Sequence, residues 1–380
     1  MIQAGGLRGA ALAGRWGEPR EAAVPVFGKR AVPNQFRAAF SPQELATVLA
    51  RYDLGNIRQI ERQLKGSRRS PKAIIISDWG RFLLKRRAHG RDHPLKVAYA
   101  HGIQQYLGRQ GFPLPRLVPV RKGDDTMVIH NGHIYEVFEY VQGEGYHRLV
   151  SETFDAGRVL GMFHRLVRGY DSDWVPSRRG YHDTDIVREC LSSIPMSVGK
   201  NDSAFGRETE LLTTVNILYD AYETAAEKIN EAGFHEWDTQ TVHSDWHPGN
   251  MMFLNGRVVA VIDYDSLHML PPITDVANGA LQFSIIGGPS DPREWPPELD
   301  LERVRRFLMG YELETPASPE QIQTLPSLMI EALIAEAVAP IAATGSFGRM
   351  EGFRFLQMIC RKVGWLQENS ERLVAMLLPR

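Results

Sequence analysis

Residues 241–265 read Thr-Val-His-Ser-Asp-Trp-His-Pro-Gly-Asn-Met-Met-Phe-Leu-Asn-Gly-Arg-Val-Val-Ala-Val-Ile-Asp-Tyr-Asp. Within this stretch two apolar, strand-like runs, 251–254 and 257–262, flank Asn255-Gly256, the dipeptide best suited to a tight type I′ turn. The pattern therefore predicts a short antiparallel hairpin. Because the outer ends of a hairpin lie close together, the loop before the first strand is expected beside the residues that follow the second strand.

The predicted hairpin gathers polar groups from its two ends. Asp245 and Asn250 lie in the loop before it, and Asp263 follows it. Two carboxylates and an amide oxygen suit Mg²⁺, which takes one or two carboxylates together with phosphate oxygens and water. A carboxylate that is not on the metal can orient a substrate hydroxyl and accept its proton. Spacing alone leaves the alternative that Asp245 and Asn250 only make loop hydrogen bonds, as Asx residues often do.

Three motifs in this region resemble those of a known family: His243-x-Asp245-x-x-x-x-Asn250, Val261-Ile262-Asp263 and Pro272-x-x-Asp275-Val276-Ala277. Together they resemble the aminoglycoside phosphotransferase/choline kinase family, which has a protein-kinase-like fold and includes homoserine kinases and spore-coat-associated kinase-like proteins. The resemblance covers about residues 50–285 well, and the helical C-terminal third is similar only in kind.

The resemblance implies roles for five polar residues. Asp245 would be the catalytic base, and Asn250 and Asp263 would be ligands of Mg²⁺ bound together with ATP. His243 would stabilise the catalytic loop, and Asp275 would support that loop structurally.

A nucleotide-binding lobe of this family needs a strand lysine that holds the phosphates of ATP. Lys85 ends an apolar strand run at the expected place, although a solvated strand-end lysine is the alternative. Residues 135–143 resemble the family's hinge, where backbone groups of Glu139 and Val141 would bind adenine. Residues 156–164 resemble the first large helix of the lower lobe, which implies a structural role for His164.

Two features depart from the family pattern. The phosphate loop is represented only by residues 65–70, which contain one glycine and much positive charge. The helix that should supply a glutamate partner for Lys85 has no Asp or Glu between Pro94 and Gln110. Either His101 or Gln104 substitutes for that glutamate, or Lys85 pairs with Asp263 or with phosphate directly.

The pattern of apolar residues changes from strand-like to helical along the chain. Strand signals occur at 57–64, 73–77, 81–85, 127–129 and 133–140, with one helix at 95–109. Helix signals occur at 154–167, 208–231, 301–311, 319–338, 352–367 and 370–378, and glycine-proline clusters predict loops at 287–297 and 338–346. We therefore expect an α+β, two-lobed protein-kinase-like fold. A small antiparallel-sheet N-lobe at 41–141 would precede a mainly helical C-lobe at 142–380, after a flexible tail at 1–40.

The composition of the chain bears on its binding partners and on its cellular compartment. The 44 basic and 45 acidic side chains give a net charge of −1, which provides no global field for binding nucleic acid or an anionic membrane. The two cysteines, Cys190 and Cys360, form no C-x-x-C motif, which disfavours a disulfide framework and fits a cytoplasmic protein. No run of 18 or more apolar residues predicts a membrane span. Oligomeric state is not readable from the sequence.

Several further residues admit two interpretations. The spacing of His243 and His247 occurs in zinc sites, but Pro248 and the missing glutamate of H-E-x-x-H argue against zinc here. Glu331 and Glu336 lie on an apolar helix, where acids either reach the surface or contact an amine-bearing substrate. Trp246 either flanks the acceptor site or packs in the core.

These observations predict an ATP-dependent phosphotransferase that moves the γ-phosphate to a hydroxyl of a small metabolite. The acceptor would be an amino alcohol, a homoserine-like amino acid, a sugar or an aminoglycoside. A catalytically weak kinase-like protein that binds nucleotide or a partner is the main alternative, and a metal-dependent hydrolase is a third.

Overall fold

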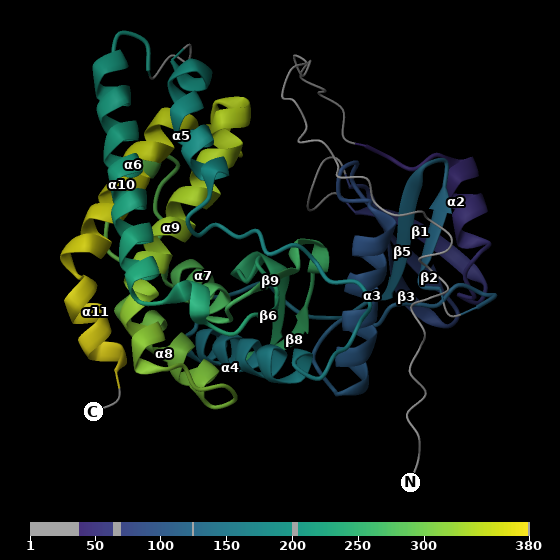
Figure 1. Cartoon of the computed structure of the whole chain (residues 1–380). Helices are drawn as coiled ribbons and strands as arrows, with labels where there is room; N and C mark the ends of the chain where they lie inside the picture. Colours follow the sequence, from purple (N-terminus) through teal and green to yellow (C-terminus); the bar gives the residue numbers. More distant parts are fainter. Residues whose placement is uncertain (1–37, 64–69, 124, 200–203, 379–380) are drawn as a thin grey trace. The chain divides into compact units, whose positions relative to one another are not determined.

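The computed structural model describes residues 38–63, 70–123, 125–199 and 204–378 (Figure 1). The chain forms two compact units. The first contains the described residues up to Arg109 together with 115–141 and 170–176, and the second contains 110–114, 142–169 and the chain from Ser177 onward. The expected tail at 1–40 falls almost entirely outside the described residues, as do residues 65–69 of the expected phosphate loop.

The first unit is built on a five-stranded antiparallel sheet. Its strands, in the spatial order β1-β2-β3-β5-β4, are β1 (Ile57–Gln63), β2 (Lys72–Ser77), β3 (Gly80–Arg86), β5 (His133–Glu139) and β4 (Met127–His130). Asn131 and Gly132 join β4 to β5 with φ angles of 50° and 75°, the left-handed pair that a type I′ turn requires. The predicted strands of the N-lobe are therefore confirmed, with ends shifted by at most one residue.

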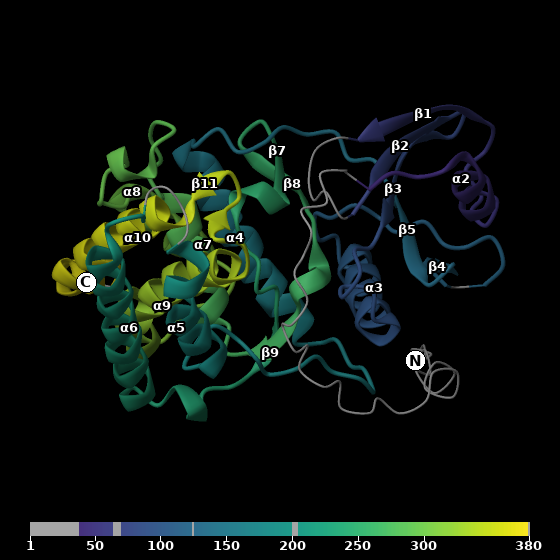
Figure 2. The ribbon, with the colours of Figure 1, turned by 90° about the horizontal axis from the view of Figure 1, so that it is seen from above.

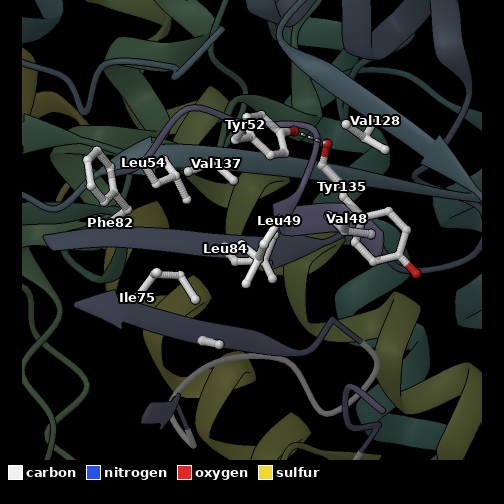
Figure 3. Packing of buried hydrophobic residues seen from close by; sticks show 11 residues of the cluster. Val48, Leu49, Tyr52, Leu54, Ile75, Phe82, Leu84, Val128, Tyr135 and Val137 are labelled. Carbon is white, nitrogen blue, oxygen red and sulfur yellow. Dashed lines mark hydrogen bonds between the residues drawn. The ribbon is translucent and has the colours of Figure 1, made fainter. Parts of the chain in front are cut away.

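Two helices cover this sheet from opposite sides, α2 (Pro42–Leu49) and α3 (Pro94–Arg109) (Figure 2). Side chains alternate between the two faces of a strand, so Leu84 and Val137 point into one face and their neighbours Lys85 and Glu136 into the other. The face under α2 is a hydrophobic cluster that includes Val48, Leu84 and Val137 (Figure 3). The other face carries charged groups and is described with the site.

The second unit is mainly helical. Its helices are α4 (Val150–Val167), α5 (Asp185–Val198), α6 (Glu208–Glu231), α7 (Ile273–Ser284), α8 (Leu301–Glu312), α9 (Pro319–Thr344), α10 (Gly352–Glu368) and α11 (Ser370–Leu377). Three two-stranded ladders accompany them: β6 (Gln240–Val242) with β9 (His268–Leu270), β7 (Met251–Leu254) with β8 (Arg257–Val261), and β10 (Ser346–Phe347) with β11 (Met350–Glu351). The α+β, kinase-like fold that the sequence predicts is confirmed by this architecture and by the structural comparisons below.

Helices α4 and α8 meet backbone to backbone. A Cβ atom at Gly157 would overlap the Phe307 carbonyl, and one at Gly310 would overlap the Phe154 carbonyl. Only glycine lets the two helices approach so closely, because any side chain at either position would force them apart. This contact fixes α4, which carries His164, a partner of Asp275 on α7.

The sequence analysis was wrong about residues 338–346, because α9 continues to Thr344. Pro340 lies inside this helix, which ends at Gly345 in the left-handed conformation with a φ of 74°. A glycine that can adopt this conformation terminates the helix, and the proline does not. The analysis also did not predict α5 and α7.

By length and composition α9 is a candidate membrane span, with a mean hydropathy of 1.6 in its most apolar window. However, 72% of that window is buried inside the fold. Such burial is typical of the core helix of a globular protein.

Candidate active site

The predicted hairpin exists as β7 and β8. Asn255 and Gly256 have φ angles of 52° and 75°, and Met251 pairs with Val261 at the open end. The Ile262 N–H donates to the Asn250 carbonyl at 2.9 Å. Residues from opposite ends of the hairpin therefore meet, which confirms the predicted hairpin and brings Asn250 beside the residue that precedes Asp263.

Asp275 on α7 supports the loop before the hairpin. Its two carboxylate oxygens accept hydrogen bonds from the His243 N–H at 2.6 Å and the Ser244 N–H at 2.8 Å. Ser244 has a φ of 59°, a left-handed conformation that is strained for a residue with a side chain. The two charge-assisted bonds hold this strained turn in place, and the structural role expected of Asp275 is confirmed.

A buried polar chain continues from Asp275. The His164 ring lies 3.2 Å from Asp275 through Nε2 and 3.0 Å from the Tyr311 hydroxyl through Nδ1. His164 and Asp275 are almost completely buried. His164 is therefore a structural link between α4, α7 and α8, as expected.

Both carboxylate oxygens of Asp245 have a neighbour that holds them. Oδ2 accepts from the Asn250 Nδ2 at 2.8 Å, and Oδ1 lies 3.4 Å from the His247 Nε2. His247 Nδ1 accepts the Gly249 N–H at 3.0 Å, so the proton of a neutral ring sits on Nε2 and faces Asp245. The carboxylate remains about one-third exposed. Asp245 is therefore an oriented but accessible carboxylate.

The oxygen donors beside Asp245 fit a hard cation. Asn250 uses its Nδ2 on Asp245, which leaves its amide oxygen for a metal. Asp263 follows β8 in the left-handed conformation, with a φ of 65°. Within the described ranges there is no group of three or more His, Cys, Asp or Glu side chains that would hold a metal by themselves. The set matches Mg²⁺, which completes its shell with phosphate oxygens and water.

His243 and Trp246 belong to an aromatic cluster beneath the loop. Both side chains are fully buried, with ring centroids 5.4 Å apart, and His243 also packs against Tyr264 at 5.1 Å. Burial lowers the pKa of His243 despite the opposing charges of Asp275 and Asp245, so the ring is neutral. Trp246 is thus a core residue, and zinc binding by His243 is not supported.

The two glutamates on α9 have different environments. Glu331 is completely buried and is hydrogen-bonded to the His182 ring at 2.8 Å and to the Asp183 N–H at 3.2 Å. Glu336 is accessible to solvent and accepts a hydrogen bond from Gln282 on α7. Surrounding protein atoms nevertheless desolvate Glu336, and together with repulsion from Asp245 they raise its pKa to about 7. Glu331 is structural, and Glu336 faces the surroundings of Asp245.

In the first unit, Lys85 lies on β3 directly opposite Glu136 on β5. The two helix residues that the sequence suggested in place of a glutamate both make hydrogen bonds to other groups. His101 bonds to Glu136 at 2.6 Å, and Gln104 bonds to the Ala100 carbonyl within its own helix at 3.0 Å. The sequence analysis did not identify Glu136, because only the pairing register of β3 and β5 reveals its position.

The predicted hinge residues, Glu139 and Val141, lie at and just beyond the C-terminal end of β5. The Glu139 N–H donates to the Arg116 carbonyl at 2.8 Å, so this group is already engaged. Val141 lies two residues beyond the end of β5 and closes the 115–141 segment of the first unit, so the adenine-binding role expected of these two residues stays a prediction.

Comparisons with known proteins identify the family of this chain. Residues 62–321 match the phosphotransferase enzyme family. The homoserine kinase of Caulobacter vibrioides (strain NA1000 / CB15N) is 24% identical over 311 residues, which span 80% of this chain and 88% of that protein. The homoserine kinase of Caulobacter sp. (strain K31) is 26% identical over 310 residues, or 80% and 87% of the two chains.

Solved structures show the same fold. The aminoglycoside phosphotransferase of Alicyclobacillus acidocaldarius aligns with a TM-score of 0.64 and 16% identity over 91% of this chain and 97% of its own. A microcompartment-associated aminopropanol kinase aligns with a TM-score of 0.63 and 14% identity over 87% and 98%. Since the family match spans more than half of the sequence, the chain belongs to the phosphotransferase enzyme family and is a small-molecule kinase.

Proposed function

We propose that this protein is an ATP- and Mg²⁺-dependent kinase that phosphorylates a hydroxyl of a small metabolite which also carries an amine. The observation that carries the proposal is the state of Asp245. Its carboxylate has a polar neighbour at each oxygen yet remains open to solvent, and it lies beside Asn250, whose carbonyl is bonded to the residue before Asp263.

In the proposed reaction Asp245 orients the acceptor hydroxyl and receives its proton as the oxygen attacks the γ-phosphate. Asn250 and Asp263 would hold Mg²⁺, which supplies charge neutralisation for the phosphates when bound. Lys85 would hold the phosphates, and Glu139 and Val141 would bind adenine. Catalysis of this kind depends mainly on positioning and electrostatics.

Glu336 supports an amine on the acceptor. Its solvent-accessible carboxyl lies within electrostatic reach of Asp245, where a substrate ammonium would find a countercharge. The relatives named homoserine kinase and aminopropanol kinase act, by their names, on molecules that combine a hydroxyl with an amine. An amino alcohol or a homoserine-like amino acid is therefore preferred over a sugar without an amine.

Mass spectrometry after incubation with ATP and a metabolite extract tests the proposal. A metabolite that gains one phosphate in the presence of wild type, and does not with Asp245→Asn, would support it. Comparing each active acceptor with its deaminated analogue then tests the amine. Release of inorganic phosphate with no phosphorylated product would favour a hydrolase, and nucleotide binding without any turnover would favour a binding protein.

A further inference from the structure

The phosphate-holding lysine of a protein kinase is fixed by a glutamate from a neighbouring helix. Here α3 contains no acidic residue from Pro94 to Arg109. If Lys85 holds the phosphates, as the proposed function requires, its ammonium must be positioned by a different group.

Glu136 is placed to do this. It is the direct cross-strand partner of Lys85 in the β3–β5 ladder, and directly opposed residues of antiparallel strands project from the same face of the sheet. That face is opposite to the one that packs under α2, since Leu84 and Val137 belong to the hydrophobic cluster there. Glu136 is completely buried.

The two oxygens of Glu136 have different surroundings. Oε1 accepts from Arg87 Nη2 at 2.7 Å and lies 2.6 Å from His101 Nε2. Oε2 is buried and has no hydrogen-bond partner among the described residues. A second acceptor oxygen is therefore available beside the strand position of Lys85.

Neighbouring basic groups keep the buried carboxyl of Glu136 ionised. Burial acts to raise the pKa of this carboxyl, but the charge of Arg87, the hydrogen bond from His101 and the charge of Lys85 together hold the pKa well below its usual range. A buried carboxylate stays ionised only where such compensation exists. Glu136 is thus an anion that faces three basic side chains.

We propose that Glu136 is the positioning carboxylate of Lys85, so that a strand residue performs the task that a helix glutamate performs in protein kinases. The lysine and the carboxylate sit on adjacent hydrogen-bonded strands, and the ladder itself sets their spacing. Helix α3 contacts Glu136 through His101, which bonds to Glu136 through one ring nitrogen and to Thr126 through the other, at 2.6 Å. Movement of α3 would not separate Lys85 from its countercharge.

A double-mutant cycle separates this role from a purely structural one. The variants are Lys85→Met, Glu136→Gln and the double variant, and the readouts are kcat, the KM for ATP and the free energy of unfolding in urea. If Glu136 acts through Lys85, E136Q raises the KM for ATP about tenfold in the wild-type background, within the range of coupling between contacting residues, and changes it little in the K85M background. Equal effects of E136Q in both backgrounds would overturn the proposal.

Two further variants serve as controls for the double-mutant cycle. Glu136→Asp keeps the buried charge, so it preserves folding if E136Q does not, and the same dependence on Lys85 is expected at smaller amplitude. Thr126→Val removes a buried hydrogen bond from the same cluster without touching Glu136, and it should lower stability without changing the KM for ATP. A rise in that KM with T126V equal to that of E136Q would contradict a specific role.

A failure of the proposed kinase function would give a different experimental result from a failure of the positioning role of Glu136. A wild-type protein that turns over no acceptor but binds ATP still permits the cycle, with the Kd for ATP by calorimetry as its readout. Loss of coupling between Lys85 and Glu136 in that measurement would overturn the positioning role, and an intact coupling would sustain it.

Discussion

The support that Asp275 gives to the catalytic loop makes a quantitative prediction for Asp275→Asn. The native carboxylate accepts two backbone N–H groups, at 2.6 and 2.8 Å, in a fully buried position. The asparagine has one acceptor oxygen, so it can serve one of these groups and turns an NH₂ toward the other.

The expected loss follows from those contacts. One hydrogen bond to a charged group contributes about 1.5–3 kcal/mol, and a buried N–H left without an acceptor costs about 1–3 kcal/mol, so D275N should lose about 2.5–6 kcal/mol of stability. Domains typically have about 5–15 kcal/mol in total, so the variant should still fold at low temperature. Release of the strained turn at Ser244 should also misplace Asp245, and a displacement of this kind lowers kcat about 100-fold.

Urea unfolding and steady-state kinetics at 15 °C measure both effects. Glu331→Gln is the matched control, because Glu331 is equally buried and accepts a backbone N–H but does not touch the catalytic loop. It should lose some stability and keep the wild-type kcat. The reasoning would be refuted if D275N lost less than about 1 kcal/mol, or if it lost stability as expected while kcat stayed at the wild-type value.

Three other residues give sharp expectations. His247→Asn keeps an acceptor for the Gly249 N–H but removes the Nε2 contact with Asp245, so kcat should fall about tenfold with little change in Tm, and an unchanged kcat would exclude a role for that contact. Glu336 has a pKa of about 7, so the KM for an amine acceptor should rise as the pH falls below 7 and the carboxyl is protonated, and Glu336→Gln should raise this KM and remove its pH dependence in assays from pH 6 to 8.5. The raised pKa also means that the charged carboxyl of Glu336 is less favourable in the folded state than in the unfolded state. E336Q should therefore have a higher free energy of unfolding than wild type at pH 8 and the same one at pH 4, and the opposite order would show that Glu336 is not desolvated. Burial lowers the pKa of Lys362 to about 8, so between pH 8 and 10.5 the unfolded chain binds a proton that the folded chain does not. The free energy of unfolding of wild type, relative to that of Lys362→Met, should therefore rise over this interval in urea titrations. A difference that does not change with pH would mean that the lysine is solvated.

The catalytic loop was predictable because its information is local. Asn255-Gly256 fixes the turn, the turn fixes the pairing of β7 with β8, and the pairing brings Asn250 beside Ile262. None of these steps depends on residues distant in sequence. The family motifs then supplied the role of Asp275, which the two backbone hydrogen bonds confirm.

Other parts of the site depend on distant contacts and were not readable. The missing acid of α3 was evident from the sequence, but the replacement that we propose, Glu136, follows only from the register of two strands in which it pairs with Lys85, 51 residues earlier in the chain. Glu331 and Glu336 are five residues apart on one apolar helix, and only their neighbours on other helices distinguish a buried structural acid from an accessible one. The predicted break at 338–346 gave too much weight to Pro340.

The chain of contacts from Asp275 through His164 to Tyr311 has a consequence for hydrogen exchange. The His243 and Ser244 amides are held by a carboxylate that is itself anchored to α4 and α8, so they cannot open by local fraying of the loop. Their protons should exchange only when the helical unit unfolds as a whole. The loop that must be most accurately placed for chemistry would then be among the slowest-exchanging loops in the protein, and its geometry would persist for as long as the fold does.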